Sequence, residues 1–314
     1  MTPGFNDDIK CIRINLDPIP STYRPLVFYL VTHGLFSLLT ELLMRMLGFR
    51  RYYSGSLEYW HRAGGGSEST QDGREKKDST EKGGVKEGKS IPLVFCHGLG
   101  IGVLSYFTLV QKLVAMDPSR PIFMTSMPHI SMRIVEKQAS PAQVVAGVQE
   151  MLQGHGHSSA HFAGHSFGTI VCAWVVKAVP SMVSHLTMLD PVCLLLCKHD
   201  VAFSFLHKEP ANMPELLMQW FVGHELYIAH SLTRTFNWQS NILWPDEIPC
   251  PATIVLSADD HVVPSSSVRK QLASFVKRGV NLYPLDVVWL EDRGHAGFLL
   301  HPPSFDQILG LLQK

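Results

Sequence analysis

The pattern of apolar and polar positions divides the sequence into three stretches. Residues 1–62 form an N-terminal extension with one long apolar run, residues 63–90 are almost entirely polar or glycine, and residues 91–314 alternate short apolar runs with helix-compatible segments. Short continuous apolar runs between amphipathic helices are typical of a mostly parallel sheet that is covered on both faces. The third stretch therefore predicts an α/β domain.

Six apolar runs in the third stretch have the length and composition of strands. They are Ile91–Cys96, Pro121–Ser126, Ala160–Ala163, Leu186–Leu189, Ala252–Ser257 and Asp286–Leu290. Helical spacing is found at Leu104–Met116, Pro141–Leu152, Thr169–Lys177, Ser265–Lys277 and Ser304–Leu312. Each strand is thus followed by a helix or by a longer excursion, as a parallel sheet requires.

The apolar run between Pro25 and Gly48 is long enough to cross a membrane as a helix. Its polar residues recur at every fourth position and share one helical face: His33, Ser37, Glu41 and Arg45. A charged side chain costs about 2.5–3.5 kcal/mol near the centre of a membrane helix, which weakens the case for a simple span. Two alternatives stay open. The helix lies in or obliquely through a bilayer, with Arg45, Arg50 and Arg51 at the headgroups, or it packs on the rest of the chain.

The flanks of this helix carry weaker signals. Residues 1–24 have balanced charge and several prolines, so we expect no cleaved signal peptide. The aromatic stretch Tyr52–Arg62 suits either a membrane interface or the start of a strand. Residues 63–90 are rich in Gly, Ser, Glu and Lys and cannot bury enough apolar surface to offset the entropy of ordering, which predicts a disordered linker or a long loop.

Composition excludes several classes of function. The sequence has 27 basic and 27 acidic residues, so nothing in its charge favours nucleic acid as a partner. Its cysteines are scattered and mostly lie in apolar runs, at positions 11, 96, 172, 193, 197 and 250. This distribution indicates free thiols in a reducing, intracellular compartment. Cys193, Cys197 and His199 lack a fourth ligand, and we expect neither a metal nor a cofactor.

The motif Gly164-His165-Ser166-Phe167-Gly168 carries the candidate chemistry. It stands between a strand and a helix, where a sharp turn can present the hydroxyl of Ser166, and the two glycines make that turn sterically possible. A serine becomes a strong nucleophile only beside a base, which itself needs an acid to orient it. Downstream, Asp259 and Asp260 follow one strand and His295 follows the last, in the order Ser, Asp, His.

With these motifs, residues 91–314 resemble the α/β-hydrolase fold superfamily. The matching segments are His97-Gly98, Gly164 to Gly168, Leu189-Asp190-Pro191, Asp259 to Pro264 and Gly294-His295. The resemblance implies a mostly parallel sheet with helices on both faces and a helical cap at about 192–248. It places the acid at Asp260, because the family's acid usually precedes x-x-Val-Pro-like residues. Asp259 stays the alternative, since Ser257 stands where the family usually has glycine before the acid.

The oxyanion of an acyl-transfer reaction needs two preorganised N–H donors. Phe167 offers one at the start of the helix after Ser166, and the resemblance makes Leu99 the other. His97 is then expected to support the oxyanion loop. His301 and Asp306 have the spacing of an acyltransferase motif, but His301 lies outside the expected position of the base, so we interpret the match as chance.

Together these features predict a serine hydrolase that cleaves a small-molecule ester, with a lipid-like acyl or alcohol part suggested by the many apolar residues of the cap. Ser166, His295 and Asp260 would be nucleophile, base and acid. The alternatives are an acyltransferase that uses the same acyl-enzyme and a non-catalytic binding protein. The expected location is intracellular, either membrane-associated through residues 25–48 or cytoplasmic.

Overall fold

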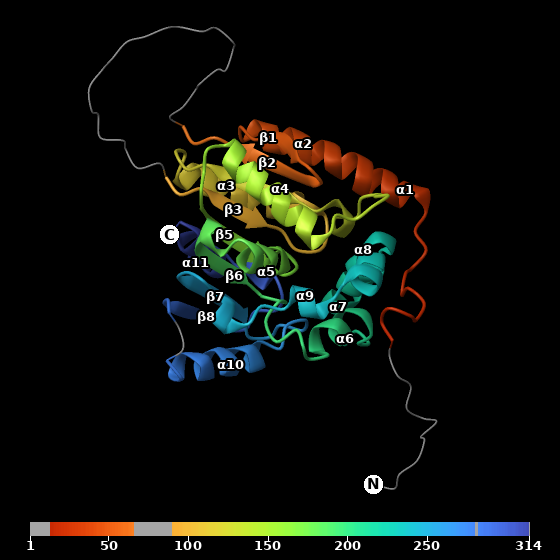
Figure 1. Ribbon diagram of the computed structural model, residues 1–314. Coiled ribbons are helices and arrows are strands. Elements are labelled where there is room, and N and C mark those ends of the chain that lie inside the picture. The colour runs from red at the N-terminus through yellow and green to blue at the C-terminus, as the bar shows by residue number, and fades with distance from the viewer. Residues whose placement is uncertain (1–12, 66–89, 280–281, 314) are drawn as a thin grey trace, which may run out of the picture.

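A computed structural model describes residues 13–65, 90–279 and 282–313. Within these ranges eight strands form one sheet, in the order β1-β2-β4-β3-β5-β6-β7-β8 (Figure 1). The strands are β1 Arg50–Ser54, β2 Leu57–Arg62, β3 Leu93–Cys96, β4 Ile122–Ser126, β5 Ala160–His165, β6 Val183–Leu189, β7 Ala252–Ser257 and β8 Leu285–Leu290. All pairs from β4 to β8 are parallel, whereas β1 with β2 and β2 with β4 are antiparallel. The predicted α/β fold class is confirmed.

Helices cover both faces of the sheet. Those outside the cap and the N-terminal helix are α3 Phe107–Met116, α4 Pro141–Gly154, α5 Gly168–Ala178, α10 Ser265–Lys277 and α11 Pro302–Leu312. One buried cluster joins α4, α5 and α10 to the sheet, and a second joins α3 and α11 to the opposite face. Short 3-10 turns lie at Gly102–Tyr106, Pro128–Ile130, Pro180–Met182 and Gly297–Leu300.

The sheet begins earlier in the sequence than residue 91, where we expected the α/β domain to start. The aromatic stretch around Tyr59 forms the hairpin β1–β2, whose second strand pairs with β4 along the whole length of β4. Helix α4 lies so close to this hairpin that a Cβ at Gly147 would stand 2.6 Å from the Cβ of Leu57. The hairpin is therefore part of the body of the protein, and the expected boundary at 91 does not coincide with an edge of the sheet. Most of the expected linker at 63–90 lies outside the described residues.

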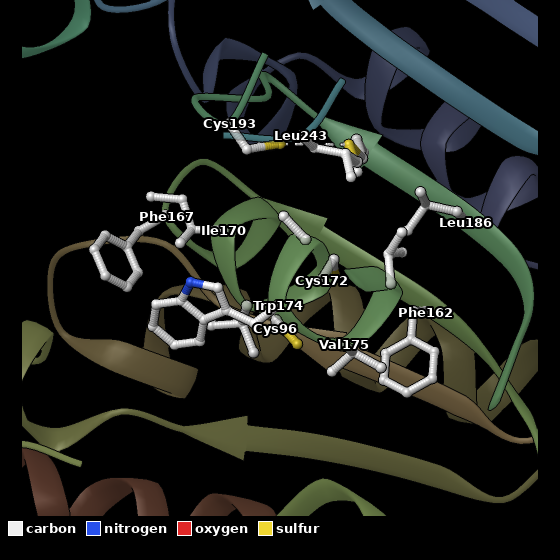
Figure 2. Packing of buried hydrophobic residues seen from close by; sticks show 14 of the residues in the cluster. Cys96, Phe162, Phe167, Ile170, Cys172, Trp174, Val175, Leu186, Cys193 and Leu243 are labelled. Carbon is white, nitrogen blue, oxygen red and sulfur yellow. Dashed lines mark hydrogen bonds between the residues drawn. The ribbon is translucent and has the colours of Figure 1, made fainter. Parts of the chain in front are cut away.

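Helix α5 crosses the centre of the molecule. All of its residues from Gly168 to Val176 are buried. Figure 2 shows Ile170, Trp174 and Val175 of this helix packed between the strand residues Cys96 and Phe162 and the cap residue Leu243. The indole of Trp174 also donates to Asn241 Oδ1 of the cap at 2.9 Å. Helix α5 therefore anchors the cap, and it also fixes Phe167, the residue directly before the helix.

The cap follows β6 and is helical. It contains α6 Asp200–Leu206, α7 Met213–Met218, the π-helical turn Gln219–Gly223, α8 Leu226–His230, the π-helical turn Ser231–Thr235, α9 Trp238–Asn241 and the 3-10 turn Pro245–Glu247. Figure 1 shows these elements gathered beyond the carboxyl ends of the parallel strands. The cap thus covers the end of the sheet at which α/β proteins bind their ligands.

The helix expected between Pro25 and Gly48 is present. It consists of α1 Leu26–Tyr29, a π-helical segment Leu30–Leu35 and α2 Phe36–Met46. In the described part of the chain, this is the one helix long and apolar enough to cross a membrane. Figure 1 shows it running along the body beside β1 and β2, with its N-terminal end next to α8 of the cap.

Candidate active site

Ser166 stands at a sharp turn between β5 and α5. Its φ angle is +52°, a conformation that costs energy for a residue with a side chain. The turn also needs close backbone approaches: a Cβ at Gly168 would lie 1.9 Å from the carbonyl oxygen of Cys96, and one at Gly164 would lie 2.6 Å from that of Gly168. The sequence motif therefore folds as expected for a strand–turn–helix elbow that aims the Ser166 hydroxyl at the end of the sheet.

His295 and Asp260 meet Ser166 at this end of the sheet. His295 Nε2 lies 2.8 Å from Ser166 Oγ, and His295 Nδ1 lies 2.8 Å from Asp260 Oδ2. The side chains of His295 and Asp260 are almost completely buried. A proton on Nδ1 donates to the carboxylate, which leaves Nε2 free to accept the proton of the serine hydroxyl.

The turn after β7 decides which of the two neighbouring carboxylates faces His295. The amides of Val262 and Val263 donate to Asp260 Oδ1 at 2.7 and 2.8 Å, which fixes the carboxylate with its other oxygen toward the imidazole. Asp259 is exposed, and its amide donates to the carbonyl of Arg293. The geometry thus brings Asp260 to the histidine and leaves Asp259 outside the site.

Asp190 is a further carboxylate at the site, to which the sequence assigned no role. It follows β6, is 1% exposed and has a φ angle of +45°. Its Oδ1 accepts from the amide of Ser257 at 3.1 Å and its Oδ2 from the amide of Ala296 at 2.9 Å. Asp190 therefore ties the end of β7 to the loop that carries His295. The signal that could have found it is an acidic residue directly after a buried strand, at the same sheet edge as Ser166 and Asp260.

His165 links Asp190 to the loop after β3. Gly98 donates its amide to the Tyr106 hydroxyl at 3.0 Å, and that hydroxyl lies 2.6 Å from His165 Nδ1. His165 Nε2 faces Asp190 Oδ2 at 3.7 Å. Burial lowers the pKa of His165, so this ring stays neutral and accepts from Tyr106. The loops that follow β3, β5, β6 and β8 are thereby connected through buried polar groups.

Two opposing effects set the proton affinity of His295. Burial disfavours the imidazolium and lowers its pKa, but the charge and hydrogen bond of Asp260 and the charge of Asp190 outweigh this effect and raise the pKa to about 9. Burial lowers the pKa of His97 and of His129 to about 4. Of these three buried histidines, His295 is therefore the one that titrates in the alkaline range.

The expected oxyanion donors lie at the pocket that contains Ser166. Leu99 and Phe167 both line the pocket at the serine. In the described residues, neither of their backbone N–H groups has an acceptor. His97 accepts from the amide of Met127 at Nε2, so its Nδ1 carries the proton and donates to the Gly98 carbonyl at 2.7 Å. His97 thus braces the loop that presents the Leu99 amide.

An apolar pocket opens beside the Ser166 hydroxyl. It lies between the elbow and the cap. Its walls include Ile170 of α5, Phe205 and Leu206 of α6, Leu232 of the turn Ser231–Thr235 and Phe236 directly after that turn. The apolar lining suits an acyl chain or another hydrophobic group.

Other polar groups singled out in the sequence lie elsewhere. Cys193 is buried and Cys197 is exposed. His301 caps the start of α11 through Ser304, and Asp306 forms an exposed ion pair with Lys112 at 3.3 Å. None of these side chains reaches Ser166 in the described structure.

A metal ion would have to compete with hydrogen bonds at the site. Asp190, Asp260 and His295 offer ligand atoms that all lie within 4.8 Å of one another. In the described residues they form the one such cluster of potential metal ligands. Their atoms already bond to Ser166 and to four backbone amides. The donor set fits proton transfer better than metal binding.

The architecture and the position of the elbow are those of the α/β-hydrolase fold. No protein-family model matches the sequence, and no curated protein is significantly similar to it. Among solved structures, a bacterial membrane phospholipase A is similar over 91% of this chain and 92% of its own, with a TM-score of 0.59 and 16% identity. A carboxylesterase from Bacillus subtilis gives 0.55 and 12% over 88% and 96% of the two chains. A naproxen esterase from the same organism gives 0.55 and 12% over 90% and 98%.

These neighbours are hydrolases of the esterase and lipase type. At such low identities the likeness establishes the shared fold, and it says nothing about the substrate of this chain.

Proposed function

We propose that the protein is a serine hydrolase that cleaves a carboxylic ester with a hydrophobic acyl or alcohol part. The observation that carries this proposal is the hydrogen-bonded chain from Ser166 through His295 to Asp260, placed at the mouth of an apolar pocket. A carboxylate at the elbow would be needed for an epoxide hydrolase or a dehalogenase, so Ser166 favours acyl transfer.

In the first half of the reaction, Ser166 Oγ attacks the ester carbonyl carbon while its proton passes to His295 Nε2. Asp260 keeps the imidazole in the required tautomer and stabilises the imidazolium. The amides of Leu99 and Phe167 bind the oxyanion, and such a donor contributes roughly 3 kcal/mol by precedent. His295 then protonates the leaving alcohol, and an acyl-enzyme is formed on Ser166.

In the second half, a water molecule attacks the acyl-enzyme as His295 takes its proton. The carboxylic acid leaves and the hydroxyl of Ser166 is restored. An alcohol in place of water would make the protein an acyltransferase. Product analysis distinguishes the two: hydrolysis yields free acid, whereas transfer yields a new ester and requires an added acceptor.

Labelling with a fluorophosphonate probe tests the nucleophile. Wild-type protein should be labelled, Ser166→Ala should not, and Ser266→Ala, an exposed serine on α10, should be labelled like the wild type. A folded wild-type protein that resists the probe would support the non-catalytic alternative. Labelling that survives Ser166→Ala would place the nucleophile elsewhere.

We also propose that the protein associates with a membrane through residues 25–48. The support is the composition of the helix Leu26–Met46 and the exposure of many of its large apolar side chains. A protein that stays in the soluble fraction of a lysate without detergent would argue against this location.

A further inference from the structure

The helix Leu26–Met46 turns most of its polar residues toward the body, beside the buried Met44, and most of its aliphatic residues toward solvent. A helix on the surface of a water-soluble protein turns its apolar side inward. Here the polar residues Thr32, His33, Ser37, Thr40 and Glu41 are buried or half-buried against the body. The exposed side is aliphatic: Leu26, Val27, Leu30, Val31, Leu35, Leu38, Leu39, Leu42 and Met46. This face extends over a length of roughly 30 Å at the helical rise of 1.5 Å per residue.

Polar contacts hold the inner face to the body at the start, middle and end of the helix. The hydroxyl of Tyr29 donates to Glu225 Oε1 of the cap at 2.9 Å, and the amide of Ile134 donates to His33 Nδ1 at 3.0 Å. Glu41 forms an ion pair with Arg51 of β1 at 3.0 Å. A helix that crossed a bilayer would have to break these contacts and leave His33 and Glu41 in hydrocarbon.

The exposed apolar surface continues from the helix onto the cap. The ring of Phe28 packs on Phe221 with centroids 5.5 Å apart, and the Arg24 guanidinium lies 3.8 Å above the ring of Trp220. Trp220, Phe221 and the neighbouring Leu226 are themselves partly open to solvent. Figure 1 shows the end of α1 beside α8, so the two apolar areas adjoin.

The charges around this surface match a lipid headgroup layer. Arg45 and Arg50 are exposed at the C-terminal end of the helix, and Tyr23 is exposed at the other end. Glu41, the acidic residue of the helix, is turned inward by Arg51. Arginine and aromatic side chains at the margins of an aliphatic surface are typical of the membrane interface. In a protein–protein interface, these residue types are enriched at the centre of the contact surface instead.

We infer that the outer face of Leu26–Met46, continued by Trp220, Phe221 and Leu226, docks on one leaflet of a bilayer that contains anionic phospholipid, with the helix axis in the plane of the membrane. This inference rests on the proposed membrane association and specifies its mode. The cap helix α6 lines the catalytic pocket with Val201, Phe205 and Leu206. A lipid ester in the docked leaflet is then separated from Ser166 by the cap and not by the sheet.

Vesicle flotation tests the docking face. Full-length wild-type protein should float with phosphatidylcholine vesicles that contain phosphatidylserine, and binding should weaken without phosphatidylserine. The double variant Leu38→Glu/Leu42→Glu should bind at least tenfold more weakly. The matched control Ile91→Glu/Leu282→Glu changes two exposed apolar residues that precede β3 and β8, and it should float like the wild type.

Cysteine labelling tests the orientation on sealed vesicles. In a Cys11→Ser/Cys197→Ser background, Tyr23→Cys and Arg50→Cys should both react with an impermeant maleimide added outside. Protection of one of the two until detergent is added would mean that the helix spans, and it would overturn the inference. Flotation of Leu38→Glu/Leu42→Glu at the wild-type level would also overturn it, as would a dimer in lipid-free solution that this variant dissociates.

Activity on a short soluble ester and fluorophosphonate labelling are measured on the same preparations. Both should be unchanged in Leu38→Glu/Leu42→Glu, because the helix does not contribute to the Ser166 pocket. A failure of docking with intact labelling leaves the hydrolase proposal standing. A failure of labelling with intact docking leaves the membrane inference standing.

Discussion

At the scale of single residues, the turn after β7 gives adjacent aspartates different environments. Asp260 is bonded to His295 and to two amides, while Asp259 is exposed. We expect Asp260→Asn to lower kcat by up to ~10⁴, because the amide favours the wrong tautomer of the histidine. Asp259→Asn is the matched control and should retain wild-type kinetics on a soluble ester. The reverse pattern would show that the acid is Asp259.

The raised pKa of His295 predicts the pH dependence of the reaction. The base must be neutral to accept the proton of Ser166, and its pKa is about 9. In the free enzyme, kcat/KM should therefore rise about tenfold per pH unit through the neutral range and level off above the pKa. A profile that is already flat at neutral pH would contradict the charge environment described for His295.

Asp190 can be separated from Asp260 by the same measurement. Its negative charge favours the imidazolium, so Asp190→Asn should move the midpoint of the kcat/KM profile to lower pH. Its bond to the Ala296 amide also positions the histidine loop, so kcat at high pH should fall as well. A purely structural role would lower activity without moving the midpoint.

At the scale of elements, the contact between α4 and the hairpin β1–β2 tests whether the hairpin belongs to the folded body of the protein. A methyl group at Gly147 would stand 2.6 Å from Leu57 Cβ and 2.8 Å from the carbonyl oxygen of Ser54, whereas one at Gly154 in the same helix would meet nothing within 4 Å. Gly147→Ala should reduce the free energy of unfolding in urea by about 1–3 kcal/mol. Gly154→Ala should leave it unchanged or increase it by up to about 1 kcal/mol. Equal effects would mean that the hairpin is not packed as described.

At the scale of the whole molecule, local signals predicted more than distant ones. The parallel sheet, its flanking helices and the helix Leu26–Met46 follow from runs and spacings within a few residues, and the fold class was predicted correctly. The sequence also named Ser166, Asp260 and His295, whose side chains the structure brings into contact; their catalytic roles stay a proposal.

The features that were not predicted depend on partners far apart in the chain. The hairpin β1–β2 joins the sheet by pairing with β4, which lies far along the sequence: Glu58 of β2 pairs with Ser126 of β4. The importance of Asp190 depends on Ala296, and no spacing near either residue reveals that bond. The periodicity of the N-terminal helix did not predict which of its faces packs against the body, because an amphipathic pattern is compatible with either face turned inward.

The exposed aliphatic face of the helix Leu26–Met46 has a thermodynamic consequence. A ligand that binds only the folded state raises apparent stability by an amount that grows with its free concentration. If a bilayer is that ligand, unfolding separates the polar contacts of Tyr29, His33 and Glu41 from the body and dismantles the outer face at the same time. The Tm should therefore increase with the concentration of phosphatidylserine-containing vesicles, and it should not do so in Leu38→Glu/Leu42→Glu. Bound lipid would then contribute to the stability of the folded state as well as determine the location of the protein.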